Sequence, residues 1–394
     1  MNKKKYLEFW AASYKKDLTE NIMPFWMEHG WDKTHGGVYT CVNRDGSLMD
    51  STKSVWFQGR FAFICSFAYN NIEPNPEWLE AAKSTLDFIE KYCFDKEGHM
   101  YFSTTADGHP LRKRRYVFSE TFAAIAMSEY ALATKDMSYA KKAMKIFEDT
   151  QRFLTTPGLL EPKYEPNVKL QSHSIIMILI NVGSRIRAVI DDPKLTYQID
   201  QSIAALKKYF MHPEFKALLE MVGPHGEFID TNMTRTINPG HCLETSWFIM
   251  EESRLRGWDK DLKNMALDIF NWSWNWGWDK KYGGIINFRD CRDLPQQDYS
   301  QDMKFWWPQC EAILSSLYAY LGTGDEEYLY RHQQISEWTY AHFPDKEYGE
   351  WYGYLHRDGT VAQPAKGNLF KGPFHVPRMM IKGYTLCQDI LKTL

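Results

Sequence analysis

The sequence predicts an all-α fold, an (α/α)6 barrel of twelve helices with short β-hairpins at the active-site mouth. Three observations predict it. One turn-and-strand motif recurs along the chain, the segments between its copies have helical apolar periodicity, and the spacing between copies leaves room for two helices. A fixed period of this kind indicates a repeated supersecondary unit.

The recurring motif starts with an aromatic residue or proline followed by Asp-Lys, and continues through a glycine into a short alternating aromatic run. Most copies end in or near Asp-Gly, which is the chemistry of a turn that enters a small β-hairpin. The clear copies lie at 31–47, 94–110, 278–290 and 343–360, and weaker ones lie at 157–166 and 223–231. Asp32 and Asp95 are 63 residues apart, and Asp279 and Asp345 are 66 apart.

The segments between the hairpins carry the predicted helices. We expect them near 3–28, 53–71, 76–93, 116–134, 137–154, 171–190, 195–211, 241–256, 260–276, 303–321, 325–342 and 374–392. Six pairs without capping repeats are expected to close into a ring, whereas the alternative, an open solenoid, would need polar terminal caps. No Ser- or Gly-rich linker divides the chain, so we expect one catalytic domain over residues 1–394.

The helix after each hairpin is expected to belong to the inner ring, so that six N-terminal ends open on one face. Unusual polar and aromatic residues gather at or near these ends, which predicts a site there. The candidates are Trp56 and Arg60; Arg115, Tyr116 and Glu120; His173; His241 and Glu244; Trp307 and Glu311; and His375 and Arg378.

Composition limits the partners. The net charge is −3, so no basic field would attract nucleic acid or a membrane surface, and 15% of residues are aromatic, which suits a site for a small neutral sugar or simply fills cores. The seven cysteines are scattered and odd in number, which favours a reducing compartment, and we expect a cytoplasmic protein. The charged N-terminus has no apolar segment of a signal peptide, and no stretch is long enough to span a membrane.

Two histidines lie at helix starts that Pro and Gly define. His241 belongs to Asn-Pro-Gly-His-Cys-Leu-Glu at 238–244, and His375 belongs to Lys-Gly-Pro-Phe-His-Val-Pro-Arg at 371–378. Imidazoles with a pKa near neutrality are suited to moving a carbon-bound proton. The pattern therefore predicts a pair of bases facing one small substrate.

The other candidates each have two interpretations. Arg60 contacts the substrate or pairs with Glu311 or Glu120. Glu244, one turn after His241, orients that imidazole or is an ordinary helix-end carboxylate. Trp307 is a sugar platform or a core residue.

Motifs for metals and nucleotides are missing from the sequence. There is no His-Glu-x-x-His, no Walker loop and no Gly-x-Gly-x-x-Gly after a strand. We therefore expect no metal and no cofactor required for the chemistry.

Five blocks together resemble the N-acylglucosamine 2-epimerase family. They are Trp-Phe-Gln-Gly-Arg at 56–60, Asn-Pro-Gly-His-Cys-Leu-Glu at 238–244, Trp-Trp-Pro-Gln-Cys-Glu at 306–311, Tyr-Gly-Glu-Trp-Tyr-Gly-Tyr-Leu-His-Arg-Asp-Gly at 348–359 and Lys-Gly-Pro-Phe-His-Val-Pro-Arg at 371–378. The resemblance implies an (α/α)6 barrel and reversible epimerisation at C2 of a sugar, typically N-acetylglucosamine to N-acetylmannosamine. It implies His241 and His375 as catalytic bases, with Arg60 and Glu311 as active-site partners. It also suggests a homodimer and ATP as an allosteric activator.

His173 departs from the N-acylglucosamine epimerase pattern. Cellobiose 2-epimerases, mannose 2-epimerases and aldose–ketose isomerases of the same superfamily carry an active-site histidine at about this place. These activities therefore stay open for this chain.

The expected mechanism places C2–H of the ring-opened sugar between His241 and His375. One imidazole removes the proton, the other returns one to the opposite face, and Arg60 stabilises the enolate. Glu311 and Glu244 would orient the histidines or help to open the ring. Two further hypotheses stay open: an (α/α)6 glycoside hydrolase that uses Glu120, Glu244 or Glu311, and a sugar-binding protein without turnover.

Overall fold

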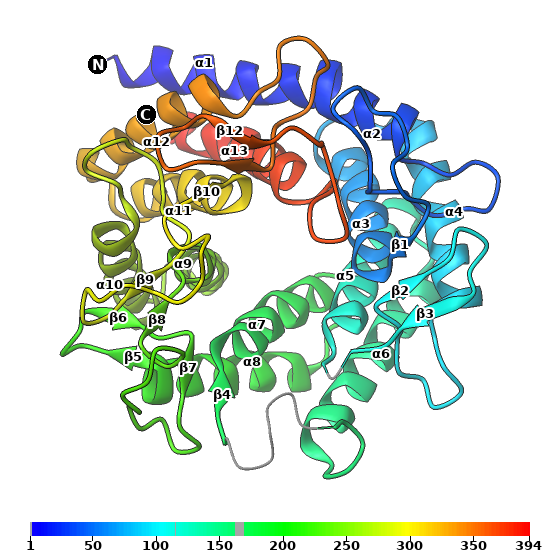
Figure 1. Cartoon of the computed structure of the whole chain (residues 1–394), viewed down its shortest axis with the longest axis horizontal. Helices are drawn as coiled ribbons and strands as arrows, with labels where there is room; N and C mark the ends of the chain where they lie inside the picture. Colours follow the sequence, from blue (N-terminus) through cyan, green and yellow to red (C-terminus); the bar gives the residue numbers. More distant parts are fainter. Residues whose placement is uncertain (1, 115, 162–168) are drawn as a thin grey trace.

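The helices form two concentric rings (Figure 1). The computed structural model describes residues 2–114, 116–161 and 169–394. The inner ring consists of α3 (Val55–Asn71), α5 (Phe118–Thr134), α7 (His173–Arg187), α9 (Pro239–Leu255), α11 (Trp306–Thr323) and α13 (His375–Leu391). Each inner helix packs on the next, and α13 packs on both α11 and α3, so the ring closes.

Each inner helix also packs on an outer partner. The outer helices are α1 (Lys3–Asp17), α4 (Pro76–Tyr92), α6 (Met137–Thr155), α8 (Pro193–Ala205), α10 (Lys260–Gly277) and α12 (Glu326–His342). The π-helical segment η1 (Leu18–Ile22) joins α1 to α2 (Met23–His29), and η2 (Leu206–Phe210) extends α8. Counted as continuous helices, the described residues contain twelve helices in six pairs, and the predicted (α/α)6 fold class is confirmed.

Sequence signals explain why the outer helices begin where they do. Asn75, Asp136, Asp192, Asp259 and Asp325 are N-caps whose side chains accept a backbone N–H of the first turn. The inner helices α3, α5 and α11 are apolar on nearly every face, because each is enclosed between the outer ring and the centre of the barrel.

Short antiparallel strands lie next to the N-terminal ends of the inner helices. Two sheets have three strands: β1 (Lys53–Ser54), β2 (Ser103–Thr104) and β3 (Pro110–Arg112), and β10 (Lys304–Phe305), β11 (Tyr354–Leu355) and β12 (Val361–Gln363). Within the described parts of the chain, three more sheets have two strands: β4 (Gln171–Ser172) with β7 (Met221–Val222), β5 (Met211–His212) with β6 (Ala217–Leu218), and β8 (Thr236–Ile237) with β9 (Arg289–Asp290). The four clear motif copies each close with a single bridge, Trp31 to Val38, Phe94 to Met100, Trp278 to Ile285 and Pro344 to Trp351.

The Asp of the recurring motif holds its turn together. Asp32 accepts the backbone N–H groups of Thr34 and His35, and the fully buried Lys53 donates to it at 2.8 Å. The same buried pair recurs in two further copies, Lys304 with Asp279 at 3.1 Å and Lys366 with Asp345 at 2.7 Å. The repeat is therefore a structural device that fastens each hairpin to the chain entering the next inner helix.

Several predicted helix boundaries were wrong by two or three residues. The helices α3, α7 and α11 begin after the predicted positions, because β1, β4 and β10 pair with a neighbouring hairpin first. Helix α9 begins two residues before its predicted start, because Asn238 caps it. Arg115 and part of the weak repeat at 157–166 lie outside the described residues. Among the described helices, none is both long and apolar enough to cross a membrane.

Candidate active site

The first turns of all six inner helices line one cavity of about 370 Å³. This volume is at the lower end of the range for small-molecule sites. Most of its wall is aromatic, which suits the apolar faces of a sugar ring. Six of the predicted site residues line it: Trp56, Arg60, His241, Glu244, Trp307 and His375.

The sequence around His241 explains its position. Asn238 caps α9 by accepting the backbone N–H of His241, and Pro239 occupies the first turn, where its missing N–H costs nothing. Gly240 allows a close approach, since a Cβ there would lie 2.4 Å from the Trp307 ring. The block thus places His241 in the first turn and seats Trp307 beside it.

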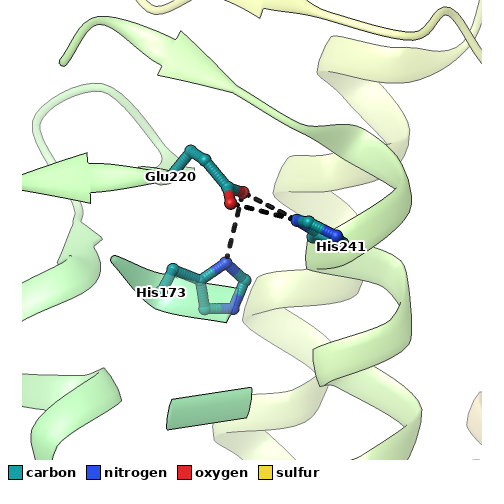
Figure 2. A group of neighbouring side chains, drawn as sticks. All are labelled: His173, Glu220 and His241. Carbon is teal, nitrogen blue, oxygen red and sulfur yellow. Dashed lines mark hydrogen bonds and ion pairs between the residues drawn. The ribbon is translucent and has the colours of Figure 1, made fainter. Parts of the chain in front are cut away.

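A carboxylate holds the His241 ring from behind. Glu220 lies between β6 and β7, and its two oxygens lie 2.9 and 3.1 Å from Nδ1 of His241 (Figure 2). Burial opposes ionisation, but the His241 imidazole holds the pKa of Glu220 well below its usual range. An anionic Glu220 accepts hydrogen bonds only, so His241 donates its Nδ1–H and is left with the lone pair on Nε2.

His375 has the same arrangement with a different carboxylate. Its Nδ1 lies 2.7 Å from Glu311, whose other oxygen accepts the indole N–H of Trp247 at 2.7 Å. Burial lowers the pKa of His375 well below its usual value, and the charge of Arg378 lowers it further. His375 is therefore neutral at physiological pH, with its Nδ1–H directed to Glu311 and its acceptor lone pair on Nε2.

Trp307 lies between the two bases. Its ring centre is 5.1 Å from that of His241 and 5.7 Å from that of His375. The indole therefore bridges the two imidazoles along the cavity wall.

Arg60 is a buried cation without a carboxylate partner among the described residues. It is 8% exposed, and its guanidinium lies 4.1 Å from the ring centre of Phe122 and 4.6 Å from that of Phe374. Within the described part of the chain, the Nε of Arg60 has no hydrogen-bond partner. Burial lowers the pKa of Arg60 to about 9, so it still carries its charge at neutral pH. A cation of this kind that lines a cavity can bind a negatively charged oxygen there.

Arg378 connects the carboxylates. Its Nη2 donates to Glu244 and, at 2.7 Å, to Glu311. Burial would lower the pKa of Arg378, but the charges of Glu311 and Glu244 outweigh burial and raise it. Arg378 is 2% exposed and does not line the cavity, so the predicted substrate contact is replaced by a contact that orients the two carboxylates.

The remaining predicted residues lie away from the cavity wall. Glu311 is fully buried and contacts Nδ1 of His375 instead of the cavity. Glu120 is directed to the neighbouring hairpin, where it accepts the backbone N–H of Met100 at 2.7 Å and contacts His99. The predicted contact of Glu120 with substrate therefore finds no support.

Glu120 instead makes the same kind of contact as two glutamines of other inner helices: each side chain accepts a backbone N–H of a neighbouring hairpin. Gln58 bonds the backbone of Val38, and Gln309 bonds that of Ile285, each just after the glycines of a motif copy. Glu120 holds Met100 at the corresponding place. Glu120 is thus a hairpin clamp, that is, a side chain that fastens the hairpin of residues 94–100 to helix α5.

Tyr116 and His173 contact residues that line the cavity but do not line it themselves. The Tyr116 ring contacts Trp56, with ring centres 5.9 Å apart, but does not line the cavity. His173 is fully buried behind His241, with Nε2 2.7 Å from the Thr245 hydroxyl. The predicted direct contacts of both residues with a sugar are not supported by this geometry.

Glu220 was missed by the sequence analysis. A signal existed, because Glu220 interrupts the apolar run Ala217–Val222 just before a Gly-Pro-His-Gly turn. A carboxylate within an apolar run requires a partner when the run is buried. The identity of that partner, His241, depends on the fold.

Known proteins resemble this chain over nearly its whole length. Residues 37–371 match the N-acylglucosamine 2-epimerase (GlcNAc 2-epimerase) family. The chain is 33% identical to N-acylglucosamine 2-epimerase of Bos taurus, over 98% of this chain and 92% of that protein. It is 26% identical to cellobiose 2-epimerase of Ruminococcus albus, over 96% and 99% of the two chains.

The fold also matches solved structures. Cellobiose 2-epimerase from Bacillus thermoamylovorans B4167 superposes with a TM-score of 0.85 at 21% identity, over 98% of this chain and 100% of that chain. The family resemblance predicted from the five sequence blocks is thereby confirmed. The chain belongs to the N-acylglucosamine 2-epimerase family of carbohydrate epimerases.

Proposed function

We propose that the protein interconverts N-acetyl-D-glucosamine and N-acetyl-D-mannosamine by moving the proton on C2. One observation carries the proposal: two imidazoles, each with Nδ1 held by a carboxylate, line one cavity beside an arginine that has no carboxylate partner among the described residues. Removal of a proton from one face and delivery to the other requires two bases. A single base would instead favour transfer to C1 and formation of a ketose.

The environments of the bases suggest their resting states. His375 is neutral, because burial and Arg378 lower its pKa. Nδ1–H of His241 faces the anionic Glu220, and this carboxylate would stabilise the imidazolium that forms when Nε2 accepts a second proton. We therefore assign His375 as the base and His241 as the acid in one direction, with the roles exchanged in the other.

Arg60 would stabilise the intermediate. When C2 loses its proton, negative charge builds on the C1 oxygen of the open-chain sugar. The guanidinium packs against aromatic rings and not against a carboxylate of the described residues, so its charge is available for that oxygen. Glu244 also lines the cavity, and its carboxylate is available to accept a sugar hydroxyl.

The cavity favours an N-acyl sugar over an unsubstituted one. Met177 and Ile178 of α7, with Phe122 of α5, provide an apolar wall for an acetyl methyl group, and Ser174 offers a hydroxyl beside them. The greater identity to N-acylglucosamine 2-epimerases than to cellobiose 2-epimerases supports the same choice. Mannose or cellobiose epimerisation is the second candidate, favoured only by the presence of His173.

Proton NMR in D₂O tests the proposal. N-acetylmannosamine, N-acetylglucosamine, mannose and cellobiose are each incubated with the protein. We expect deuterium at C2 together with the epimer for the two N-acetyl sugars, and much slower exchange for the others. Exchange with mannose or cellobiose, but not with the N-acetyl sugars, would show that the protein is a mannose or cellobiose epimerase. A lack of exchange with every sugar would refute C2 chemistry.

Three properties remain proposals that rest on the resemblance and on composition: activation by ATP, a homodimer and a cytoplasmic location. Initial rates with and without ATP, and light scattering for mass, test the first two.

A further inference from the structure

The side chains behind His241 form a group of metal-type donors. Figure 2 shows Glu220 between His173 and His241, with its carboxylate facing both rings. One ring nitrogen of each histidine and one oxygen of Glu220 all lie within 4.8 Å of one another. Two imidazoles and a carboxylate are a ligand set that zinc and other divalent transition metals accept.

The tautomer of His173 directs a lone pair at this carboxylate. The Thr245 hydroxyl has one proton and donates it to the carbonyl of His241 at 2.8 Å. It must therefore accept from Nε2–H of His173 at 2.7 Å. With its proton on Nε2, the neutral ring carries its lone pair on Nδ1.

That lone pair is unsatisfied. Nδ1 of His173 is buried without a hydrogen-bond partner among the described residues, and it lies 3.7 Å from Glu220. Two acceptors thus face each other in a buried place, an arrangement that costs free energy unless a donor or a cation joins them.

The other carboxylate–histidine group provides a comparison. Ligand atoms of Glu244, Glu311 and His375 also lie within 4.8 Å, but there the guanidinium of Arg378 bonds both carboxylates. Glu220 has no lysine or arginine ion pair in the parts of the chain that the structure describes. The group around His375 therefore has its cation built into the chain, whereas the group around Glu220 does not.

We propose that His173, Glu220 and His241 form an inhibitory binding site for a divalent transition metal such as Zn²⁺. The ligands are Nδ1 of His173, a carboxylate oxygen of Glu220 and Nδ1 of His241. Water from the cavity completes the coordination, because Glu220 reaches the cavity wall. The sequence alone predicted no metal site, since these ligands have no motif spacing.

Metal binding would switch off the base by changing its tautomer. The metal takes the place of the proton on Nδ1 of His241, and that proton moves to Nε2 of the same ring, which stays neutral. Nε2 then has no lone pair to accept a proton from C2. This consequence rests on the proposed function, whereas the binding site itself does not.

The position of the metal predicts the kinetic pattern. It would lie behind the His241 ring, away from the sugar, so substrate still enters the cavity. Zn²⁺ should therefore lower kcat with little change in KM. A metal that coordinated the sugar or blocked the mouth would raise KM instead.

Cobalt spectroscopy tests the site directly. The full-length protein is freed of metal with a chelator and titrated with Co²⁺, whose tetrahedral complexes with nitrogen and oxygen ligands absorb strongly in the visible range. We expect saturation at one equivalent and displacement by Zn²⁺. His173→Leu and Glu220→Gln should each weaken Co²⁺ binding roughly tenfold or more, since even residues outside the ligand set affect metal affinity that much.

A matched control uses a different His–Glu pair. His212 lies 2.9 Å from Glu214 on the outside of the barrel, and Glu214→Gln should leave Co²⁺ binding unchanged. Circular dichroism establishes that each variant folds, and Glu220→Gln decides alone if His173→Leu does not. Unaltered Co²⁺ affinity in the folded site variants, or no Co²⁺ binding by the wild type, would overturn the site.

Kinetics test the switch separately. Zn²⁺ should lower kcat of the metal-free enzyme, and a chelator should restore it. Binding without loss of kcat, or a rise in KM alone, would overturn the switch and leave the site standing. If the metal-free protein proves inactive on every sugar, the proposed function has failed, while the Co²⁺ spectrum still decides the site.

Discussion

Glu311→Gln tests the claim that a buried carboxylate sets the tautomer of a catalytic histidine. Glu311 is fully buried and accepts three donors, Nδ1–H of His375, the Trp247 indole and Arg378. Glutamine preserves its size and removes its charge. An amide offers only one oxygen to these donors, so at least one of them loses its acceptor.

The expected magnitude follows from those contacts. A hydrogen bond to a charged group contributes about 1.5–3 kcal/mol, which corresponds to roughly 10–150-fold in rate. If the amide NH₂ faces His375, the ring must reverse its tautomer and Nε2 loses its lone pair. The comparable change in serine proteases lowers kcat about 10⁴-fold. We therefore expect kcat to fall about 10²–10⁴-fold, with KM nearly unchanged.

Steady-state kinetics and C2 deuterium exchange measure the effect. Glu251→Gln is the control, because Glu251 is a largely buried carboxylate that accepts hydrogen bonds from Lys382 and Arg185 outside the cavity. It should reduce thermal stability and leave kcat within a small factor. The double variant of Glu311→Gln with His375→Asn should lose little beyond His375→Asn alone. A folded Glu311→Gln enzyme with near wild-type kcat would refute the reasoning.

Three more substitutions probe other parts of the barrel. Arg60→Met should lower kcat about 10²–10³-fold without lowering the melting temperature, because it removes an oxyanion partner and also a buried cation that has no carboxylate partner among the described residues; a kcat near wild type would exclude that role. Glu120→Ala should lower the melting temperature more than kcat, because it releases a hairpin clamp; a selective loss of kcat would restore Glu120 to the site. Burial lowers the pKa of His332 to about 3 and that of His375 well below normal. The unfolded chain therefore binds more protons below about pH 6.5, so the free energy of unfolding should decrease as pH falls below that value. Urea unfolding across this range measures the slope, which His332→Phe should reduce; an unchanged slope would contradict the assignment.

The roles of the carboxylates show where sequence reasoning ended. Glu120 lies in the first turn of α5 and Glu244 in the second turn of α9, and from the sequence both were glutamates near the N-terminal end of an inner helix. One clamps a hairpin and the other lines the cavity. Successive residues of a helix are rotated by about 100° around its axis. An error of one or two residues in a predicted boundary therefore changes the helix face on which a side chain is expected. Several predicted boundaries were wrong by that amount.

The sequence by itself determined the features that are encoded locally. The recurring Asp-Lys motif and the helical periodicity predicted twelve helices in six pairs, and the Asn-Pro-Gly-His block predicted a helix start with a histidine in its first turn. Caps and turns depend on neighbours in the chain, so their residues can be read in order.

Only the tertiary structure decided which groups meet. Glu311 reaches His375 across 64 positions of the chain, and Glu220 reaches both His241 and His173 from a short loop between strands. Closure of the ring brings these carboxylates behind the imidazoles, and their charge selects the tautomers. A proton's place on an imidazole depends on the partner in space, so the chemistry of this site becomes defined only when the barrel closes.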